Sequence, residues 1–141
     1  MHQRTYYAII GAMLLSLLSM TTALANSHKI TPTFNCAGTH PAWSLNIENE
    51  KFLAETPSAV KLLLNPVKPL PAAGMHLSYM RIYETTSKDP HQPVTIVIKD
   101  DPEGCTDGQS ATLHGYDVVM SMPGKAFSGC CDILDNSDHV G

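Results

Sequence analysis

Apolar and polar side chains alternate over several short stretches of the chain, which is the pattern of half-buried β-strands. In residues 43–47 (WSLNI), Trp43, Leu45 and Ile47 alternate with a serine and an asparagine. Residues 94–98 (VTIVI) are rich in β-branched side chains, which favour strands. Weaker strand patterns occur in four further segments, namely residues 51–54, 76–83, 111–122 and 125–134. These patterns predict a chain built from short strands.

Two segments fit more than one structure. Residues 58–64 (SAVKLLL) suit either a short helix or a buried strand, since prolines lie close on both sides. Residues 111–122 suit one long strand or two short ones, with a bulge at Gly115. In residues 76–83 the alternation instead points to one strand, in which Leu77, Tyr79, Arg81 and Tyr83 share a face.

Proline, glycine and acidic residues mark the segments between these strands as turns and loops. Residues 65–74 contain three prolines and residues 84–93 are polar, so both are predicted to be exposed loops. Residues 100–104 (DDPEG) are predicted to end the preceding strand, and residues 26–35 to form a loose polar arm. Outside the N-terminal segment, no long stretch shows the 3.6-residue spacing of an amphipathic helix. The chain is therefore predicted to be all-β, as a small antiparallel barrel or sandwich of about six to eight strands.

The first 25 residues have the features of a secretory signal peptide. They carry Arg4 near the start, an apolar run over residues 8–18, and small residues before Ala25. The run is shorter than the ~20 residues that a membrane-spanning helix needs, which favours cleavage after Ala25 over a membrane anchor. Residues 26–141 would then form a single β-rich domain with short polar arms at both ends and no membrane span. The predicted location is the periplasm.

The four cysteines all follow the predicted cleavage site: Cys36, Cys105, Cys130 and Cys131. An even number of cysteines in a small exported domain indicates disulfides. A bridge between the neighbours Cys130 and Cys131 would need a distorted peptide, so each is predicted to pair with either Cys36 or Cys105. In an extended segment these two side chains point to opposite faces, which allows different partners. The spacing matches neither a zinc site nor a C-x-x-C redox motif.

Charge and motifs narrow the classes of function. The formal net charge is −4, and loss of Arg4 makes the remaining domain more acidic. Without a basic stripe, nucleic-acid binding is not expected. The chain has no G-x-S-x-G motif and no glycine-rich phosphate loop, so it is predicted to be neither an enzyme nor a cofactor-binding protein. The alternative function is an envelope copper, zinc or redox protein, because His114, Met120 and Met122 offer ligands that Cu(I) prefers.

Two segments form the candidate binding surface. Residues 34–43 contain His40 and the only tryptophan, Trp43, beside a Gly/Pro turn, and residues 105–110 contain Asp107. Aromatic residues are enriched in recognition surfaces, so Trp43 could form the floor of a groove. The other interpretation places Trp43 in the core, where it closes one end of a barrel.

The same segments carry a resemblance to a known family. The pattern F-x-C-x-G-x-x-P-x-W-x-L-x-I occupies residues 34–47, C-x-D-G-x-S occupies residues 105–110, and G-C-C occupies residues 129–131. Together they resemble a family of small exported proteins and lipoproteins of Gram-negative bacteria that has no established activity. Some members are joined to a domain similar to inhibitors of C-type lysozyme. The chain departs from the family pattern at Ala42 and Gln109, and it lacks a lipid-acceptor cysteine. The resemblance implies a β-rich envelope protein.

We therefore expect a non-catalytic periplasmic domain that binds a protein or an envelope component. The most specific version of this hypothesis is an inhibitor of a hydrolase such as lysozyme. Lysozyme is strongly basic and would attract an acidic domain. The expected inhibitory element is a protruding loop, either residues 65–74 or residues 85–93.

Overall fold

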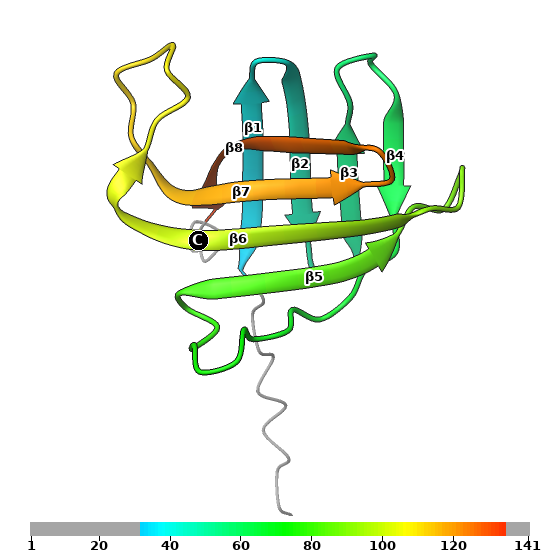
Figure 1. Cartoon of the computed structure of the whole chain (residues 1–141), viewed down its shortest axis with the longest axis horizontal. Coiled ribbons are helices and arrows are strands. Elements are labelled where there is room, and N and C mark those ends of the chain that lie inside the picture. Colours follow the sequence, from blue (N-terminus) through cyan, green and yellow to red (C-terminus); the bar gives the residue numbers. More distant parts are fainter. Residues whose placement is uncertain (1–31, 135–141) are drawn as a thin grey trace, which may run out of the picture.

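The computed structural model describes residues 32–134, which form eight β-strands joined by turns and loops (Figure 1). The strands are β1 (Thr33–Thr39), β2 (Ala42–Glu48), β3 (Lys51–Glu55), β4 (Lys61–Leu64), β5 (Met80–Thr86), β6 (Pro93–Cys105), β7 (His114–Met122) and β8 (Lys125–Leu134). The all-β prediction and the expected number of strands are confirmed. The predicted signal peptide and the polar C-terminal tail lie outside the described residues.

The strands follow one another around a nearly closed antiparallel barrel. Their order in the sheet is β4-β3-β2-β1-β8-β7-β6-β5, so β1 pairs with both β2 and β8. The two ends of the sheet, β4 and β5, meet at a bridge between Leu64 and Ser87. Figure 1 shows β1–β4 running across the direction of β5–β8, so that the curved sheet encloses its own core. We call the gap between β4 and β5 the seam.

Alternation along the strands fills the barrel with apolar side chains. Ile96 on β6 lies opposite Met120 on β7, which in turn lies opposite Phe127 on β8, so these side chains share the inner face. Ile96 and Met120 are fully buried, and Met122 also belongs to the core. Burial of each such side chain contributes ~1.5–3 kcal/mol. The two methionines considered as copper ligands are therefore core residues.

Two disulfides tie β8 to the rest of the barrel. Cys36 is bonded to Cys131 and Cys105 to Cys130. Cys131 stands directly opposite Cys36 in the β1–β8 register and belongs to the core, whereas Cys130 reaches the end of β6. The prediction that the two neighbours have different partners is confirmed, and the pairing that the sequence left open is now assigned. Each bridge contributes ~2–4 kcal/mol, and their presence indicates an oxidising compartment.

The N-terminal half differs from the prediction at β1, and it decides between the two alternatives left open for residues 58–64, of which the strand is confirmed over β4. The polar arm is wrong from residue 33 onward, because this segment forms β1 and directs Phe34 and Cys36 into the core. Polar neighbours on both sides hide this short alternation in the sequence. Of residues 58–64, only β4 is extended, and none is helical. Ala59 adopts a positive φ of 58°, which a right-handed helix does not allow.

β5 begins and ends later than the pattern predicts. Residues 76–79 form a turn, so the predicted strand face that includes Leu77 and Tyr79 is wrong for these two residues. At its other end, β5 runs into the loop predicted over residues 84–93. The extension is stable because Thr85 is buried and its hydroxyl donates to a backbone carbonyl oxygen.

β6 does not end at the acidic turn predicted over residues 100–104. The chain stays extended to Cys105, but pairing with β7 is interrupted between Asp100 and Cys105. β7 is a single strand, and its Gly115 faces this interruption. The irregularity is therefore a bulge whose extra residues belong to β6, where their polar side chains remain exposed or partly exposed.

Candidate functional site

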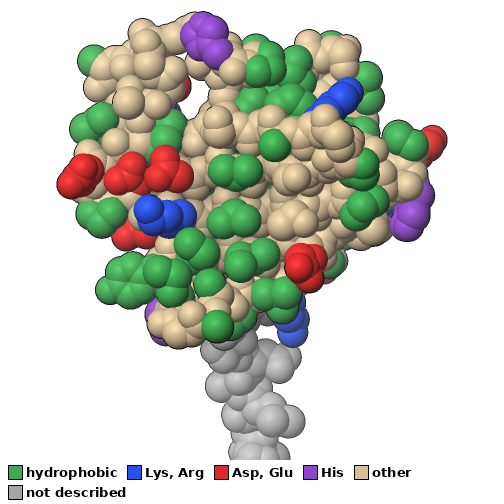
Figure 2. All heavy atoms as spheres, in the orientation of Figure 1, with side chains coloured by type: hydrophobic (Ala, Val, Ile, Leu, Met, Phe, Trp, Pro, Cys, Tyr) green, Lys and Arg blue, Asp and Glu red, His purple; other side chains and the backbone are tan. Residues whose placement is uncertain are grey.

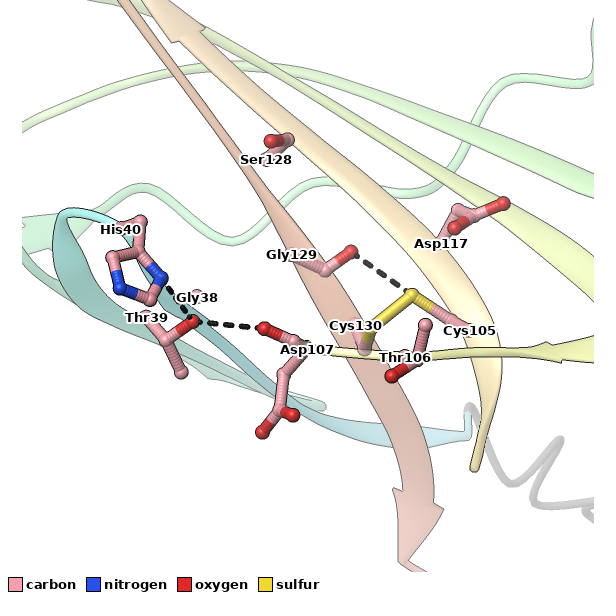
Figure 3. A pocket seen from close by; sticks show the side chains of 10 residues that line it. All are labelled: Gly38, Thr39, His40, Cys105, Thr106, Asp107, Asp117, Ser128, Gly129 and Cys130. Carbon is pink, nitrogen blue, oxygen red and sulfur yellow. Dashed lines mark hydrogen bonds between the residues drawn. A yellow bond between two sulfur atoms is a disulfide. The ribbon is translucent and has the colours of Figure 1, made fainter. Parts of the chain in front are cut away.

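A hollow of about 270 Å³ opens where the turn between β1 and β2 meets the segment that follows β6 (Figure 3). We call it the polar hollow. Asp117 on β7 and part of β8 complete its wall. Its lining consists of Gly38, Thr39, His40, Cys105, Thr106, Asp107, Asp117, Ser128, Gly129 and Cys130. The hollow thus brings together two of the three predicted binding residues, His40 and Asp107.

Hydrogen bonds join the two loops across the polar hollow. The hydroxyl of Thr39 donates to the backbone carbonyl oxygen of Asp107 (3.1 Å). Nδ1 of His40 lies 3.1 Å from the same hydroxyl, and its Nε2 lies 3.4 Å from Nε2 of Gln109. Because the Thr39 proton is already donated, these contacts assign the His40 tautomer with its proton on Nδ1, which leaves Nε2 to accept from the Gln109 amide.

Asp107 shapes the loop that carries it. One carboxylate oxygen, Oδ1, accepts hydrogen bonds from the backbone N–H groups of Gln109 (2.8 Å) and Ser110 (2.9 Å). The Ser110 bond, followed by the Gln109 bond, holds the pKa of Asp107 below its ordinary value. This is an Asx-type turn, in which a side chain replaces a backbone acceptor. Asp107 therefore stays ionised at neutral pH.

Trp43 lies beneath this region rather than in the lining of the polar hollow. Its side chain is 5% exposed, packs against Phe127, and donates from Nε1 to the carbonyl oxygen of Ser128 (2.9 Å). Gly38 stands opposite Trp43 in the β1–β2 register, and a Cβ at Gly38 would collide with the indole ring. Trp43 therefore belongs to the core, and it also borders a neighbouring hollow of about 370 Å³ beside the β3–β4 turn, which includes Pro57.

A second glycine brings β8 close to β1 at the base of the polar hollow. A Cβ at Gly129 would overlap the carbonyl group of Ala37, so a side chain cannot be accommodated there. The next residue, Cys130, bonds to Cys105 and fixes the start of the 106–113 loop against β8. The Sγ of Cys105 also lies 3.5 Å from the carbonyl oxygen of Gly129. An oxidised sulfur has no proton to donate, so this is a van der Waals contact that narrows the hollow.

The polar hollow carries negative charge. Asp107 and Asp117 contribute carboxylates to its lining, which includes no Lys or Arg. Asp117 also lies opposite Lys99 on β6, next to the bulge that carries further acids. Figure 2 shows acidic side chains gathered on this side of the barrel. We call Asp117 together with Asp100, Asp101 and Glu103 the acidic face. The arrangement suits binding of a cationic or hydrogen-bond-donating group.

The residues of the alternative metal site do not come together. His114, at the start of β7, pairs with Asp132 on β8, with Nδ1 and Oδ2 2.7 Å apart. Met120 and Met122 lie six and eight positions further along the same strand, inside the barrel. Within residues 32–134, no group of three or more His, Cys, Asp or Glu side chains is arranged to hold a metal ion.

Sequence reasoning missed two lining residues of the polar hollow, Asp117 and Ser128. Neither belongs to a motif, and they meet Thr39 of the predicted segment 34–43 only because of the β1–β8 and β7–β8 pairings. The glycines at positions 38 and 129 were the available signal, since a glycine inside a strand marks a close approach.

Comparison with models of protein families, with curated proteins and with solved structures found no match to this chain. The family resemblance of residues 34–47, 105–110 and 129–131 therefore stays a prediction. No helix in the described part of the chain is long and apolar enough to cross a membrane.

Proposed function

We propose that this protein is a non-catalytic binding domain, exported to the periplasm, whose polar hollow receives a basic group of a protein partner. The main support for the proposal is that covalent and hydrogen bonds hold the polar hollow in a fixed shape. A disulfide fixes one wall at Cys105 and Cys130, and the hydrogen bond from Thr39 to Asp107 joins the opposing loops. A site held in this way loses little conformational entropy when a ligand binds.

The protruding element in this proposal is the loop over residues 106–113. Figure 1 shows it rising from one end of the barrel, and Leu113 near its end is 63% exposed. Residues 65–74 are less suitable than expected, because Leu70 pairs with Ile82 and lies along β5. The loop predicted at residues 85–93 is also shortened by the extension of β5.

The partner that we propose first is a basic hydrolase of the lysozyme type. Support comes from the acidic face, since opposite charges steer association and favour a cationic partner. It also comes from the family resemblance, in which some members are joined to a domain similar to lysozyme inhibitors. The carboxylates of Asp117 and Asp107 would accept hydrogen bonds from Lys or Arg side chains of the partner.

A binding assay with matched variants tests the proposal. Immobilised residues 26–141 are exposed to a C-type lysozyme and to an acidic protein of similar size, at physiological ionic strength. We expect micromolar or tighter binding to lysozyme alone, weakened about threefold to tenfold in Asp117→Asn, because exposed charge pairs contribute ~0.2–1 kcal/mol or somewhat more when partly buried. Asp89→Asn serves as the control, because this exposed residue lies in the hairpin between β5 and β6.

Two results decide the outcome. Absence of lysozyme binding and inhibition at micromolar concentration would remove the lysozyme-inhibitor function. Equal effects of Asp117→Asn and Asp89→Asn would show that binding follows net charge and does not involve the polar hollow. A pull-down from a periplasmic extract with the same two variants then extends the test to envelope components.

A further inference from the structure

Two hydrogen-bond donors inside the barrel have no partner, and both come from β5. Arg81 lies opposite Ile98, and Tyr83 lies opposite Ile96. Since both isoleucines are fully buried, the two polar side chains face the interior of the barrel. Tyr83 itself is fully buried. Among the described residues, neither its hydroxyl nor Nη1 of Arg81 has a hydrogen-bond partner.

Buried donors without a partner lower the stability of a folded protein. A buried donor without a partner loses its bonds to water and gains nothing in return, and the loss is larger for a charged group. No carboxylate compensates Arg81 within residues 32–134, where the one ion pair joins His114 to Asp132. Unsatisfied buried groups in native proteins call for a specific explanation, such as a bound molecule.

The surroundings of the two donors are aromatic and aliphatic. The guanidinium carbon of Arg81 lies 5.1 Å from the centre of the Phe34 ring, which packs edge-on against Tyr116. The ring of Tyr83 packs edge-on against Phe52. Burial raises the pKa of Tyr83, and the charge of Arg81 opposes that rise, as expected if the guanidinium faces the hydroxyl. The hydroxyl of the fully buried Tyr83 and one nitrogen of the partly buried Arg81 thus share an apolar environment.

The same strand borders the seam, where two isolated bridges take the place of a ladder of paired residues. Across the seam, the described backbone contacts of β5 are the Leu64–Ser87 bridge with its flanking hydrogen bonds and the Leu70–Ile82 bridge. Ile82 stands between Arg81 and Tyr83 in the sequence. Opening the barrel at this point breaks four backbone hydrogen bonds and the side-chain bonds that join Asn65 to Thr85 and Thr86, whereas every other strand boundary carries an uninterrupted run of at least four paired residues.

We propose that Arg81 and Tyr83 bind the carboxylate of a small organic acid with an aliphatic body, which enters the barrel through the seam. A carboxylate accepts hydrogen bonds from both donors and compensates the charge of Arg81. Water can form the hydrogen bonds but does not compensate the charge of Arg81, and an inorganic anion makes no use of the apolar surroundings of the two donors. This inner site is separate from the polar hollow and is independent of the function proposed for it.

Calorimetric titration of the protein with sodium hexanoate tests the inner site. 1-Hexanol is the neutral control, and sodium chloride keeps the ionic strength constant. We expect hexanoate to bind more tightly than 1-hexanol. Tyr83→Phe is expected to weaken hexanoate binding by about tenfold, and Arg81→Met by more, because Arg81 forms an ion pair with the carboxylate in addition to a hydrogen bond. Tyr79→Phe removes a hydroxyl from an exposed side chain and should leave the affinity unchanged.

Several outcomes would overturn the proposal: no hexanoate binding to the wild type, equal binding of hexanoate and 1-hexanol, or unchanged affinity in Tyr83→Phe. Loss of binding in Asp117→Asn with retention in Tyr83→Phe would place the acid outside the barrel and would also refute it. Tyr83→Phe keeps the ring and its packing, so this variant decides the question even if Arg81→Met does not fold. Unchanged fluorescence of the single tryptophan verifies the fold.

Discussion

Replacement of Gly38 by alanine tests how the wall between β1 and β2 is packed. The added methyl group would overlap Nε1 of Trp43 and would lie 2.5 Å from the carbonyl oxygen of Ser128. Contacts this short force a shift of the indole ring and break its hydrogen bond to Ser128. Overpacking in a core costs ~1–3 kcal/mol, and the lost hydrogen bond adds ~1 kcal/mol. Alanine also lowers the conformational entropy of the unfolded chain, which offsets ~0.4–1 kcal/mol of this loss. We therefore expect Gly38→Ala to lower the free energy of unfolding by about 2–3 kcal/mol.

Urea unfolding monitored by tryptophan fluorescence measures this loss, because Trp43 is the only tryptophan in the chain. With an m-value of ~1–3 kcal/mol/M, the midpoint should fall by about 1–3 M. Gly115→Ala is the matched control, since a Cβ at Gly115 meets no atom within 4 Å. It should change stability by less than ~0.5 kcal/mol.

Equal midpoints for Gly38→Ala and Gly115→Ala would refute the packing argument. A further comparison identifies the cause of any loss. In a Trp43→Phe background the smaller ring leaves more room, so Gly38→Ala should cost less than it does beside the indole. Circular dichroism replaces fluorescence as the readout for this pair, and an undiminished cost would exclude Trp43 as the source of the clash.

Two further predictions concern the disulfides and the polar hollow. Replacing both cysteines of the bridge between β1 and β8 by alanine should lower the free energy of unfolding by about 1 kcal/mol more than the same change in the bridge between β6 and β8, because the two bridges span 95 and 25 residues of the chain. Urea unfolding of both double variants measures this difference, and equal losses would contradict it. The pKa of Asp107 is lowered, chiefly by the backbone N–H of Ser110, so its carboxylate stabilises the folded state above pH 3.8 and this contribution is lost as the pH falls through the folded-state pKa. Asp107→Asn should therefore lower the thermal unfolding temperature at pH 7 but have no effect in strong acid, and a loss of equal size at both pH values would argue against the ionised role.

The pattern of side chains predicts those strands whose alternation is locally complete. Residues 43–47 lie within β2, and residues 125–134 coincide with β8, where the neighbouring cysteines face opposite sides as expected. β1 is missed because its two inward side chains, Phe34 and Cys36, stand among polar residues and a glycine. The bulge in β6 is read as a turn because local sequence cannot distinguish looped-out residues from a chain reversal.

The site is predictable only where a motif marks it. His40 and Asp107 lie in segments with unusual spacing, and the structure brings both to the polar hollow. Asp117 and Ser128 reach the same place through strand register, which depends on pairing between distant segments. The unpaired donors of Arg81 and Tyr83 are similarly invisible in the sequence, because a polar residue in a strand normally indicates an exposed face.

The way the disulfides connect the chain has a consequence for how the protein matures. During synthesis from the N-terminus, Cys36 and Cys105 are the first two cysteines to emerge, and they are not partners. The partner of Cys36 is the last cysteine to emerge, directly after the partner of Cys105. Order of arrival would therefore favour the wrong bridge in an oxidising compartment. The two native pairs come together where β8 lies between β1 and β7, so we expect the assembled barrel to select them.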